Sequence, residues 1–366
     1  MFSDLNRIIV LVGPIARIGD VPRGGYQACN QRTLVALINN NVRVVALCYP
    51  EPVGSRVSKA FSYFLGFSIL LWKLIVTKKN VIHITGLYKH FIYAELLFVF
   101  FSKFSRCKVI YDIRAGSAIR FYYSKSSIYR WAFRSVLLMS DKVMIEGAEY
   151  LEFVRTISGK TAFLLPNHVS LSSNSDNFRQ CLNKLSDSMT LIYAGRLVQS
   201  KGIDVVLGAA SILRMRKLRV KLKIVGSGES EYVSQLKSNY SHPDNEWLGL
   251  MAASEVLANF SISHFFLFPT IHPGEGHSNA LTEAMAAGCV PITSENGFNK
   301  SVVGVCGCVL PLSATKFDYA DAIIEILNNS FWSKMSIAAK KRARKKFDTH
   351  KIVNSLISEY QALGYR

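Results

Sequence analysis

Short apolar runs alternate with longer, amphipathic segments along the chain. In the first half, runs typical of buried strands lie at 7–13, 42–48, 80–85, 108–113, 142–146 and 162–165. The segments between them have the pattern of helices, as at 26–40 and 124–139. Buried strands separated by helices predict a mostly parallel sheet with helices on its faces. The first half is therefore expected to form a doubly wound α/β domain.

A polar, serine-rich segment at 171–188 interrupts this alternation and is expected to be a linker. The alternation then resumes, with strands at 189–194, 220–225, 245–248, 264–268 and 289–293, and helices at 203–217, 229–239, 253–260 and 279–287. A chain of 366 residues suits two domains. We expect an α/β fold of two Rossmann-like domains, 1–170 and 189–345, facing each other across a cleft. The helical segment 346–366 is expected to pack back toward the first domain.

The net charge of +19 is unevenly distributed. Residues 1–170 hold 22 Lys and Arg against 9 Asp and Glu, and 54–134 holds 14 basic residues against only Glu95 and Asp112. Such a basic surface suits nucleic acid or an anionic membrane. Nucleic acid is disfavoured because the aromatic residues fall in apolar blocks, whereas a stacking groove needs them singly among basic residues.

Two very apolar stretches, 61–76 and 91–101, lie within this basic region. Each is shorter than the roughly 20 residues of a spanning helix and carries a charge. They are either buried helices of the α/β domain or helices with one side in a membrane interface. We predict the second, with an anionic membrane surface as partner and no nucleic acid. The expected anchors are Lys73, Lys78, Lys79, Lys103 and Arg106.

Seven scattered cysteines argue against a disulfide framework and for a reducing compartment. The run 7–13 is too short for a secretory signal and is better interpreted as a first strand. The expected location is cytoplasmic, peripheral on the inner face of the cell membrane. Cys306-Gly-Cys308 has no second pair or histidine cluster nearby, so we interpret it as core or turn packing.

The segment 275–288 carries the strongest chemical signal. Glu275 and Glu283 flank a small-residue loop that opens directly into a helix-forming run between two strand-like segments. Backbone N–H groups at a helix start can hold a phosphate or a polarised oxygen, and Gly276 permits close approach. Carboxylates on either side can accept hydrogen bonds from sugar and ribose hydroxyls. Glu283 alone would more simply lie on the wet face of an ordinary helix; the whole block favours a sugar-nucleotide site.

Two other loops are expected to line the same cleft between the two domains. Arg196 and Lys201 follow the strand 189–194, where a planar fork of donors and a compact cation suit neighbouring phosphates. Gly24 and Gly25 precede a probable helix, where backbone can approach a phosphate. Gly226 and Leu248 lie at two further strand ends, as a slot for the base or as simple turns. The chain has no Asp-x-Asp sequence to hold magnesium on a diphosphate, so no metal is expected.

With these motifs the chain resembles the family 4 retaining glycosyltransferases, which have the GT-B fold, and among them the bacterial polysaccharide type. The resemblance covers essentially the whole chain but is specific only in 190–310. Its motifs are Gly195-Arg-Leu with Lys201-Gly202, Gly226-Ser-Gly228, and Glu275-x7-Glu283 followed by Ala-Met-Ala-Ala-Gly. The stretch Ser140-Asp-Lys-Val to Pro166-Asn167 is similar to the family's domain junction.

The resemblance implies transfer of a sugar from a nucleotide diphosphate sugar, with retention of configuration and without metal or cofactor. A UDP-sugar is favoured over a GDP-sugar. Glu283 would hold the ribose hydroxyls, and Arg196 and Lys201 would stabilise the leaving diphosphate together with the Gly24-Gly25 loop. The donor sugar would be held by Glu275 and by the backbone of Gly276, His277, Ser278 and Asn279.

The acceptor side departs from the family pattern. Many relatives have a histidine after the third or fourth strand of the first domain, where this chain has Thr85, with His83 two residues earlier. Arg114 stands where another histidine or aspartate is common. His83, Thr85 and Arg114 are the acceptor-side candidates, although His83 is better interpreted as packed in or beside its strand.

The predicted function is transfer of a hexosyl or N-acetylhexosaminyl group to a lipid-linked glycan during synthesis of a surface polysaccharide such as O-antigen, capsule or exopolysaccharide. A nucleotide-sugar 2-epimerase of the same fold is an alternative, disfavoured because it needs additional acid–base carboxylates that the first domain scarcely offers. A non-catalytic membrane- or nucleic-acid-binding protein with a degenerate nucleotide site is a second alternative. The intact set of Arg196, Lys201, Glu275 and Glu283 argues against it.

Overall fold

The computed structural model describes residues 8–16, 18–20, 22, 24–51, 54–76, 81–114, 116–170 and 188–365. The predicted linker 171–188 lies outside the described residues except for Ser188. The chain divides into two compact units. The first combines Met1–Asn167 with Thr349–Arg366, and the second is His168–Asp348.

The first unit contains a six-stranded parallel sheet in the order β2-β1-β3-β4-β5-β6. Its inner strands are apolar and β-branched, and all residues of β1 and β3 are buried, as expected of a parallel sheet covered on both faces. Because β1 lies between β2 and β3, the strand order reverses direction between β1 and β3. The strands are β1 Ile9–Gly13, β2 Val44–Cys48, β3 Val81–Gly86, β4 Lys108–Ile113, β5 Lys142–Ile145 and β6 Ala162–Leu164.

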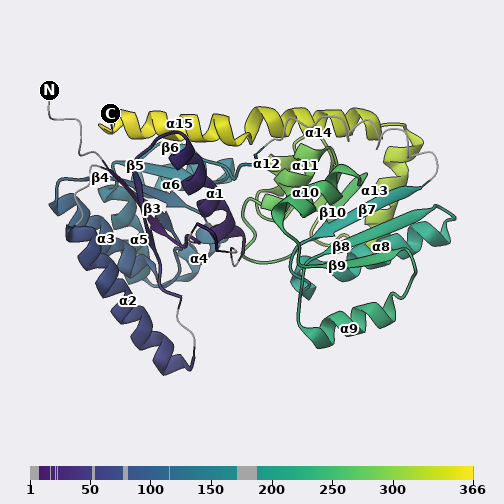
Figure 1. The fold of residues 1–366 in the computed structure, drawn as a ribbon, viewed down its shortest axis with the longest axis horizontal. Coiled ribbons are helices and arrows are strands. Elements are labelled where there is room, and N and C mark those ends of the chain that lie inside the picture. Colours follow the sequence, from purple (N-terminus) through teal and green to yellow (C-terminus); the bar gives the residue numbers. More distant parts are fainter. Residues whose placement is uncertain are drawn as a thin grey trace. The chain divides into compact units, whose positions relative to one another are not determined.

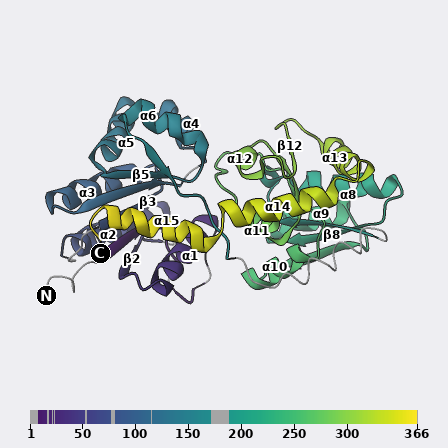
Figure 2. The same ribbon diagram turned by 90° about the horizontal axis from the view of Figure 1, so that it is seen from above.

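Helices cover both faces of this sheet. α1 and α15 contact each other on one face, while α2, α3 and α5 form a row on the other, with α3 between α2 and α5 (Figures 1 and 2). The buried apolar face of α15 completes the core on its side of the sheet. The helices are α1 Gly25–Asn39, α2 Arg56–Val76, α3 Ile92–Phe104, α4 Ala118–Ser124, α5 Ser127–Met139, α6 Leu151–Ser158 and α15 Thr349–Ala362, with the 3-10 turn η1 Ala148–Tyr150.

The second unit contains another six-stranded parallel sheet, in the order β12-β11-β10-β7-β8-β9. The strand order reverses direction between β7 and β10, so the loops that follow these two neighbouring strands meet at the carboxyl edge of the sheet. The strands are β7 Met189–Ala194, β8 Val220–Val225, β9 Asn245–Gly249, β10 Phe265–Phe268, β11 Val290–Ser294 and β12 Cys308–Leu310.

The helices of the second unit also form two layers. α8 contacts α13 in one layer, and α11 contacts both α10 and α14 in the other (Figure 1). The helices are α8 Ile203–Met215, α9 Ser230–Asn239, α10 Ala253–Ser261, α11 Asn279–Ala287, α12 Asn299–Val303, α13 Lys316–Asn328 and α14 Trp332–Lys346, with the 3-10 turn η2 Gln199–Lys201.

The predicted α/β fold with two parallel sheets is confirmed. Several boundaries differ for local reasons. The predicted helix 203–217 ends at Met215 because Lys217 has a φ of 64°, in the left-handed region that stops a helix. The predicted strand 42–48 begins at Val44, after Asn41 with a φ of 59°. The strand β12 was not predicted, because Cys308 was assigned to core or turn packing.

Candidate functional site

The switch point of the second sheet brings together the two loops that carry Arg196, Lys201 and Glu275. Lys201 Nζ lies 2.5 Å from Glu275 Oε2, and the Thr270 hydroxyl donates to the same oxygen over 2.7 Å. Both charged side chains of the pair are largely buried, with 12% and 9% of their surface exposed. Lys201 Nζ also lies 5.5 Å from the centre of the Phe268 ring. The sequence predicted that these loops would meet, and they do.

Glycines make this close approach possible. Gly202 has a φ of 72°, and a Cβ there would lie 2.3 Å from the carbonyl oxygen of Pro269. Gly226 has a φ of 134°, and its Cβ would lie 1.9 Å from the carbonyl oxygen of Gly195. A residue with a Cβ at Gly202 or Gly226 would push these loops apart. The two glycines therefore allow the loops after β7, β8 and β10 to pack closely.

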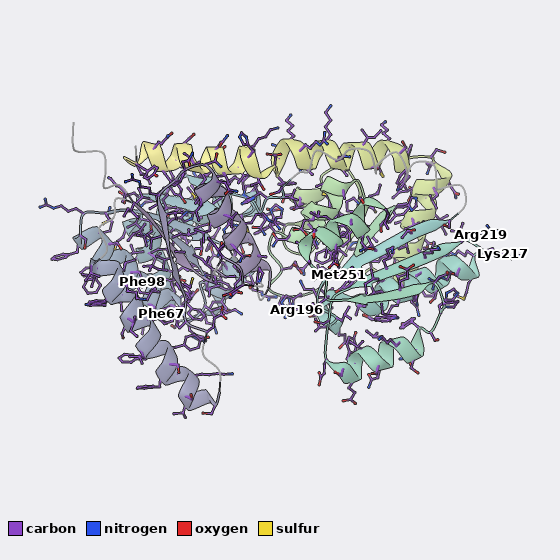
Figure 3. The ribbon with its side chains drawn as sticks, in the orientation of Figure 1. Phe67, Phe98, Arg196, Lys217, Arg219 and Met251 are labelled. Atoms are coloured by element: carbon purple, nitrogen blue, oxygen red, sulfur yellow. The ribbon has the colours of Figure 1, made fainter. Side chains whose placement is uncertain are left out.

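The Arg196 side chain is exposed at this edge of the sheet, while a hydrogen bond from a buried side chain holds its backbone. The buried Tyr193 hydroxyl donates to the carbonyl oxygen of Arg196 over 2.7 Å. Burial raises the pKa of Tyr193, and the nearby charge of Glu275 raises it further, so this hydroxyl keeps its proton. Figure 3 shows Arg196 at the opposite end of the sheet from Lys217 and Arg219, which precede β8.

His272 is a site residue that the sequence reasoning missed. Its Nε2 lies 3.4 Å from Arg196 Nη2, and its Nδ1 lies 3.1 Å from the Ser200 hydroxyl. The imidazole therefore links Arg196 to the turn that carries Lys201. The only sequence signal was its place three residues before Glu275, just ahead of the segment 275–288.

The start of α11 supplies backbone donors beside Glu275. Ser278 caps the helix, and its hydroxyl accepts from the Leu281 N–H over 3.3 Å. The His277 side chain is buried: its Nε2 lies 2.8 Å from the Thr282 hydroxyl and its ring packs edge-on against Phe347 at 5.0 Å. The sequence predicted that the backbone of 276–279 would hold the donor sugar. The burial of the His277 side chain does not conflict with that prediction.

The remaining donor-side candidates occupy less enclosed positions. Glu283 lies half-buried on α11, one turn into the helix. Gly226 follows β8, and Leu248 lies half-buried in β9, the strand next to β8. In the first unit, Gly24 has a φ of 119° and precedes α1, which begins at Gly25. Among the described residues, no atom beyond the adjacent residues lies within 4 Å of the position that a Cβ of Gly24 would take. The predicted ligand roles of these residues stay predictions.

The acceptor-side candidates lie in a buried polar network of the first unit. Arg114 Nε lies 2.5 Å from Asp112 Oδ2, and its Nη1 donates to Asn167 Oδ1 over 2.8 Å and to the Cys29 sulfur over 3.1 Å. The Arg114 side chain is only 2% exposed. Burial alone would raise the pKa of Asp112, but the charge of Arg114 and the hydrogen bonds around it lower it overall.

His83 and Thr85 belong to the same interior. His83 Nδ1 lies 2.7 Å from the Tyr360 hydroxyl of α15, and Nε2 lies 3.5 Å from Asp112 Oδ2. The Thr85 hydroxyl accepts from Asn30 Nδ2 over 3.1 Å and donates to the Val12 carbonyl. The expectation that His83 packs beside its strand matches this position. Asp112, Asn167 and Tyr360 were absent from the predicted set, and the acceptor-side role of the three candidates stays a prediction.

No group of three or more His, Cys, Asp or Glu side chains among the described residues is arranged to hold a metal ion. Metal independence itself stays a prediction.

Residues 174–346 match the family model "Glycosyl transferases group 1". This stretch, a little under half of the chain, is therefore similar to the group 1 glycosyltransferases. It contains all of the switch-point residues, and the second unit is almost wholly included in it.

Curated relatives match part of the chain. The phosphatidylinositol N-acetylglucosaminyltransferase gpi3 subunit of Schizosaccharomyces pombe is 27% identical over 180 residues, covering 46% of this chain and 38% of the relative. The lipopolysaccharide 1,2-N-acetylglucosaminetransferase of Salmonella typhimurium is 29% identical over 172 residues, 43% of each chain. The capsular polysaccharide biosynthesis glycosyltransferase CapM of Staphylococcus aureus is 24% identical over 178 residues, 48% of this chain and 47% of the relative. The chain thus spans less than half the length of these relatives.

Solved structures resemble the whole chain. Sucrose-phosphate synthase from Thermosynechococcus elongatus has a TM-score of 0.74 at 16% identity and covers 98% of this chain and 99% of its own. Anabaena HepE in complex with UDP has a TM-score of 0.71 at 12% identity, covering 97% and 99%. At such identities the likeness establishes only the fold, which is of the GT-B type. It confirms the predicted α/β class with two parallel sheets.

Proposed function

We propose that this protein transfers a sugar from a nucleotide diphosphate sugar to a glycan acceptor, with retention of configuration, as the family 4 enzymes do. One observation carries the proposal: Arg196, Lys201 and Glu275 converge at the switch point between β7 and β10, inside the stretch that matches the group 1 family. Open α/β sheets bind ligands at that point.

The cations and the helix start together suit a departing diphosphate. Two cations balance the roughly two negative charges of a diphosphate diester, and the N–H groups at the start of α11 add donors. Fixed positive groups stabilise the charge that develops as the donor bond breaks. The acceptor hydroxyl attacks from the face that the diphosphate leaves, and a phosphate oxygen takes its proton. Lys201 then exchanges part of its interaction with Glu275 for the phosphate, and Glu275 becomes available to a sugar hydroxyl.

The proposed donor is a UDP-sugar, used without metal, and the transferred group is a hexosyl or N-acetylhexosaminyl unit. Two of the relatives named above are N-acetylglucosamine transferases by name, and HepE was solved with UDP. These names support testing UDP-N-acetylglucosamine first. Glu283 is assigned to the ribose hydroxyls.

The proposed acceptor is a lipid-linked glycan at the cytoplasmic face of the cell membrane, in the synthesis of a surface polysaccharide. The names of the Salmonella and Staphylococcus relatives support this pathway class. The basic and apolar character of the first unit supports a location at the membrane.

The test is a thermal-shift screen against UDP, GDP, ADP and dTDP, with and without EDTA. We expect UDP alone to stabilise the protein, and EDTA to change nothing; at a hundred-fold excess over Kd the stabilisation is about 2.7 kcal/mol. Glu283→Ala should weaken UDP binding in calorimetry by on the order of 1.5–3 kcal/mol, because it removes charge-assisted hydrogen bonds. Glu325→Ala, on the exposed face of α13, is the matched control and should bind UDP normally.

Three outcomes would each overturn a different part of the proposal. No response to any nucleotide would exclude a donor site in the second unit. Unchanged UDP affinity in Glu283→Ala would exclude its ribose role. Conversion of UDP-N-acetylglucosamine to its 2-epimer without transfer, followed by NMR, would replace the transferase with the epimerase.

A further inference from the structure

Three neighbouring helices of the first unit, α2, α3 and α5, each present a stripe of apolar side chains to solvent. On α3 the stripe follows the spacing of one helix face, at Tyr93, Leu97, Phe100 and Phe104. On α5 it continues through Ile128, Trp131 and Leu138. Because α3 lies between α2 and α5, the stripes form one continuous surface, called here the three-helix face. Large exposed apolar surfaces mark sites of binding to proteins or membranes.

α2 is apolar on both of its sides. Its inner stripe packs on the unit: the Phe67 ring lies 5.3 Å from the Tyr49 ring and 5.9 Å from the Phe98 ring of α3. Figure 3 shows Phe67 and Phe98 next to each other. Its outer side carries Val57, Phe61, Phe64, Leu65, Ile69, Trp72, Ile75 and Val76, all exposed. Only 11% of Val57–Val76 is buried. A helix that is apolar all round is normally buried or in contact with lipid.

α2 is the one described helix that is long and apolar enough to cross a membrane. The sheet excludes a crossing in this fold. α2 connects β2 to β3, and both strands pair with β1 in the same sheet. A single crossing by α2 would place β2 and β3 on opposite sides of the bilayer. The helix can contact lipid only by lying along the surface, with its inner stripe kept on the unit.

The charges around the three-helix face distinguish between its possible occupants. The only acidic residues of 54–134, Glu95 and Asp112, are both fully buried, so the face has no exposed carboxylate from this region. Its margins are basic and exposed, at Lys59, Lys73, Lys89, Arg106, Arg120, Lys125 and Arg134. A second copy of the chain would bring these like charges together, which is unfavourable. An anionic lipid surface would be attracted to them at about 1 kcal/mol per basic residue.

We propose that the three-helix face docks on an anionic bilayer, with α2 lying in the plane of the interface. Phe64, Trp72 and Trp131 enter the boundary between headgroups and acyl chains, and the basic margins contact lipid phosphates. Trp and Phe are the side chains that favour this boundary. The inference deepens the proposed function by assigning the membrane contact to named residues, but it does not depend on the donor chemistry, which belongs to the second unit.

The experiment is co-sedimentation of the full chain with vesicles of phosphatidylcholine, with and without phosphatidylglycerol. We expect binding only with phosphatidylglycerol, and weaker binding in about 0.5 M NaCl, where exposed charges are screened. The double variant Phe64→Ser/Trp72→Ser should bind at least about ten-fold more weakly, because it removes two apolar anchors. These side chains are 72% and 63% exposed, so the fold does not need them.

The matched control is Leu250→Ser/Val305→Ser, which removes two equally exposed apolar residues, 80% and 88%, from the second unit. It should bind vesicles like the wild type. The UDP thermal shift of both double variants should be unchanged, so a failure of lipid binding and a failure of the donor site are distinguished.

Several results would overturn the docking. They are equal binding to neutral vesicles, full binding by Phe64→Ser/Trp72→Ser, and resistance of the bound wild type to extraction at high salt and alkaline pH, which marks a spanning helix. A wild-type dimer that Phe64→Ser/Trp72→Ser dissociates, with no vesicle binding by either protein, would assign the face to a second copy instead.

Discussion

At the scale of single residues, the buried carboxyl group of Glu95 in the first unit is surrounded by uncharged hydrogen-bond donors. Glu95 is fully buried and accepts hydrogen bonds from the hydroxyls of Tyr49 and Tyr111, at 3.0 and 2.6 Å, and from the Leu87 N–H at 2.8 Å. Burial raises the pKa of Glu95, and these hydrogen bonds only partly offset the effect. The same residue ties α3 to the end of β3 and to β4, below the three-helix face.

This shift predicts a dependence of stability on pH. Because the folded-state pKa of Glu95 lies above its ordinary value of 4.5, its contribution to stability is complete below that value and is lost as the pH rises through the folded-state pKa. Glu95→Gln has no such loss. We expect the unfolding free energy of Glu95→Gln to rise relative to the wild type above pH 4.5, as measured by urea unfolding across a pH series.

Glu149→Gln, at an exposed position of the same unit, is the control for the general effect of replacing a carboxylate by an amide. If the unfolding free energy of Glu95→Gln relative to the wild type does not change with pH, the prediction is wrong.

Residue contacts could be predicted from the sequence only where topology alone places them together. Lys201 and Glu275 were expected at one edge because each follows a strand of the same sheet. The network of Arg114 could not be anticipated, because Asn167 and Tyr360 lie far along the chain and enter through the packing of the unit's last segments. His272 escaped notice because no residue type or spacing separates a bridging histidine from an ordinary loop histidine.

At the scale of elements, the proposed donor site depends on the close contact of two loops at Gly202. Gly202→Ala places a Cβ 2.3 Å from the Pro269 carbonyl oxygen, in addition to the strain of an L-residue at a φ of 72°. Gly249→Ala is a matched control. Gly249 has a φ of 68°, and in the described part of the chain no atom beyond the adjacent residues lies within 4 Å of its Cβ position. We expect Gly249→Ala to cost about 1–2 kcal/mol of unfolding free energy and Gly202→Ala distinctly more.

Denaturant unfolding of both variants checks this expectation, and UDP calorimetry adds a second readout. Gly202→Ala should also weaken UDP binding, because the separated loops misplace Lys201 relative to Glu275. Equal destabilisation by the two substitutions would show that the contact between the loop after β7 and the end of β10 is not required.

Most elements could be predicted because each strand is a compact apolar run and each helix starts after a turn signal. The apolar stretch 61–76 became α2, Arg56–Val76, which extends further because Val57 and its neighbours continue the helix before the apolar run begins. The strand β12 is only three residues long, Cys308 to Leu310, and all three residues are half-buried. Its sequence alone does not distinguish it from a turn, because it is defined by its pairing with β11. Pairing partners, more than local pattern, decide such short edge strands.

At the scale of the whole molecule, the chain builds the first unit from two separated pieces. It leaves that unit at Asn167, forms the second unit, and returns as α15. Where it leaves and where it returns, Val169 and Asp348 form a parallel bridge, and the Val169 N–H donates to the Phe347 carbonyl over 2.8 Å. The first unit therefore depends on the last residues of the chain for part of its core.

Leu356→Ala tests this dependence. Leu356 is fully buried in α15, within the core cluster that includes Ile9, Val81 and Ile110 of the first sheet, so its truncation should cost about 2–5 kcal/mol. The loss belongs to the first unit, whereas the proposed UDP site lies in the second. In calorimetry, Leu356→Ala should lower the midpoint temperature of one unfolding transition, and UDP should raise that of another. Ser355→Ala, on the exposed side of α15, should lower neither midpoint. If Leu356→Ala and UDP shift a single shared transition, the two units unfold together. The last helix then contributes to the stability of the proposed donor site as well as to the core that it completes.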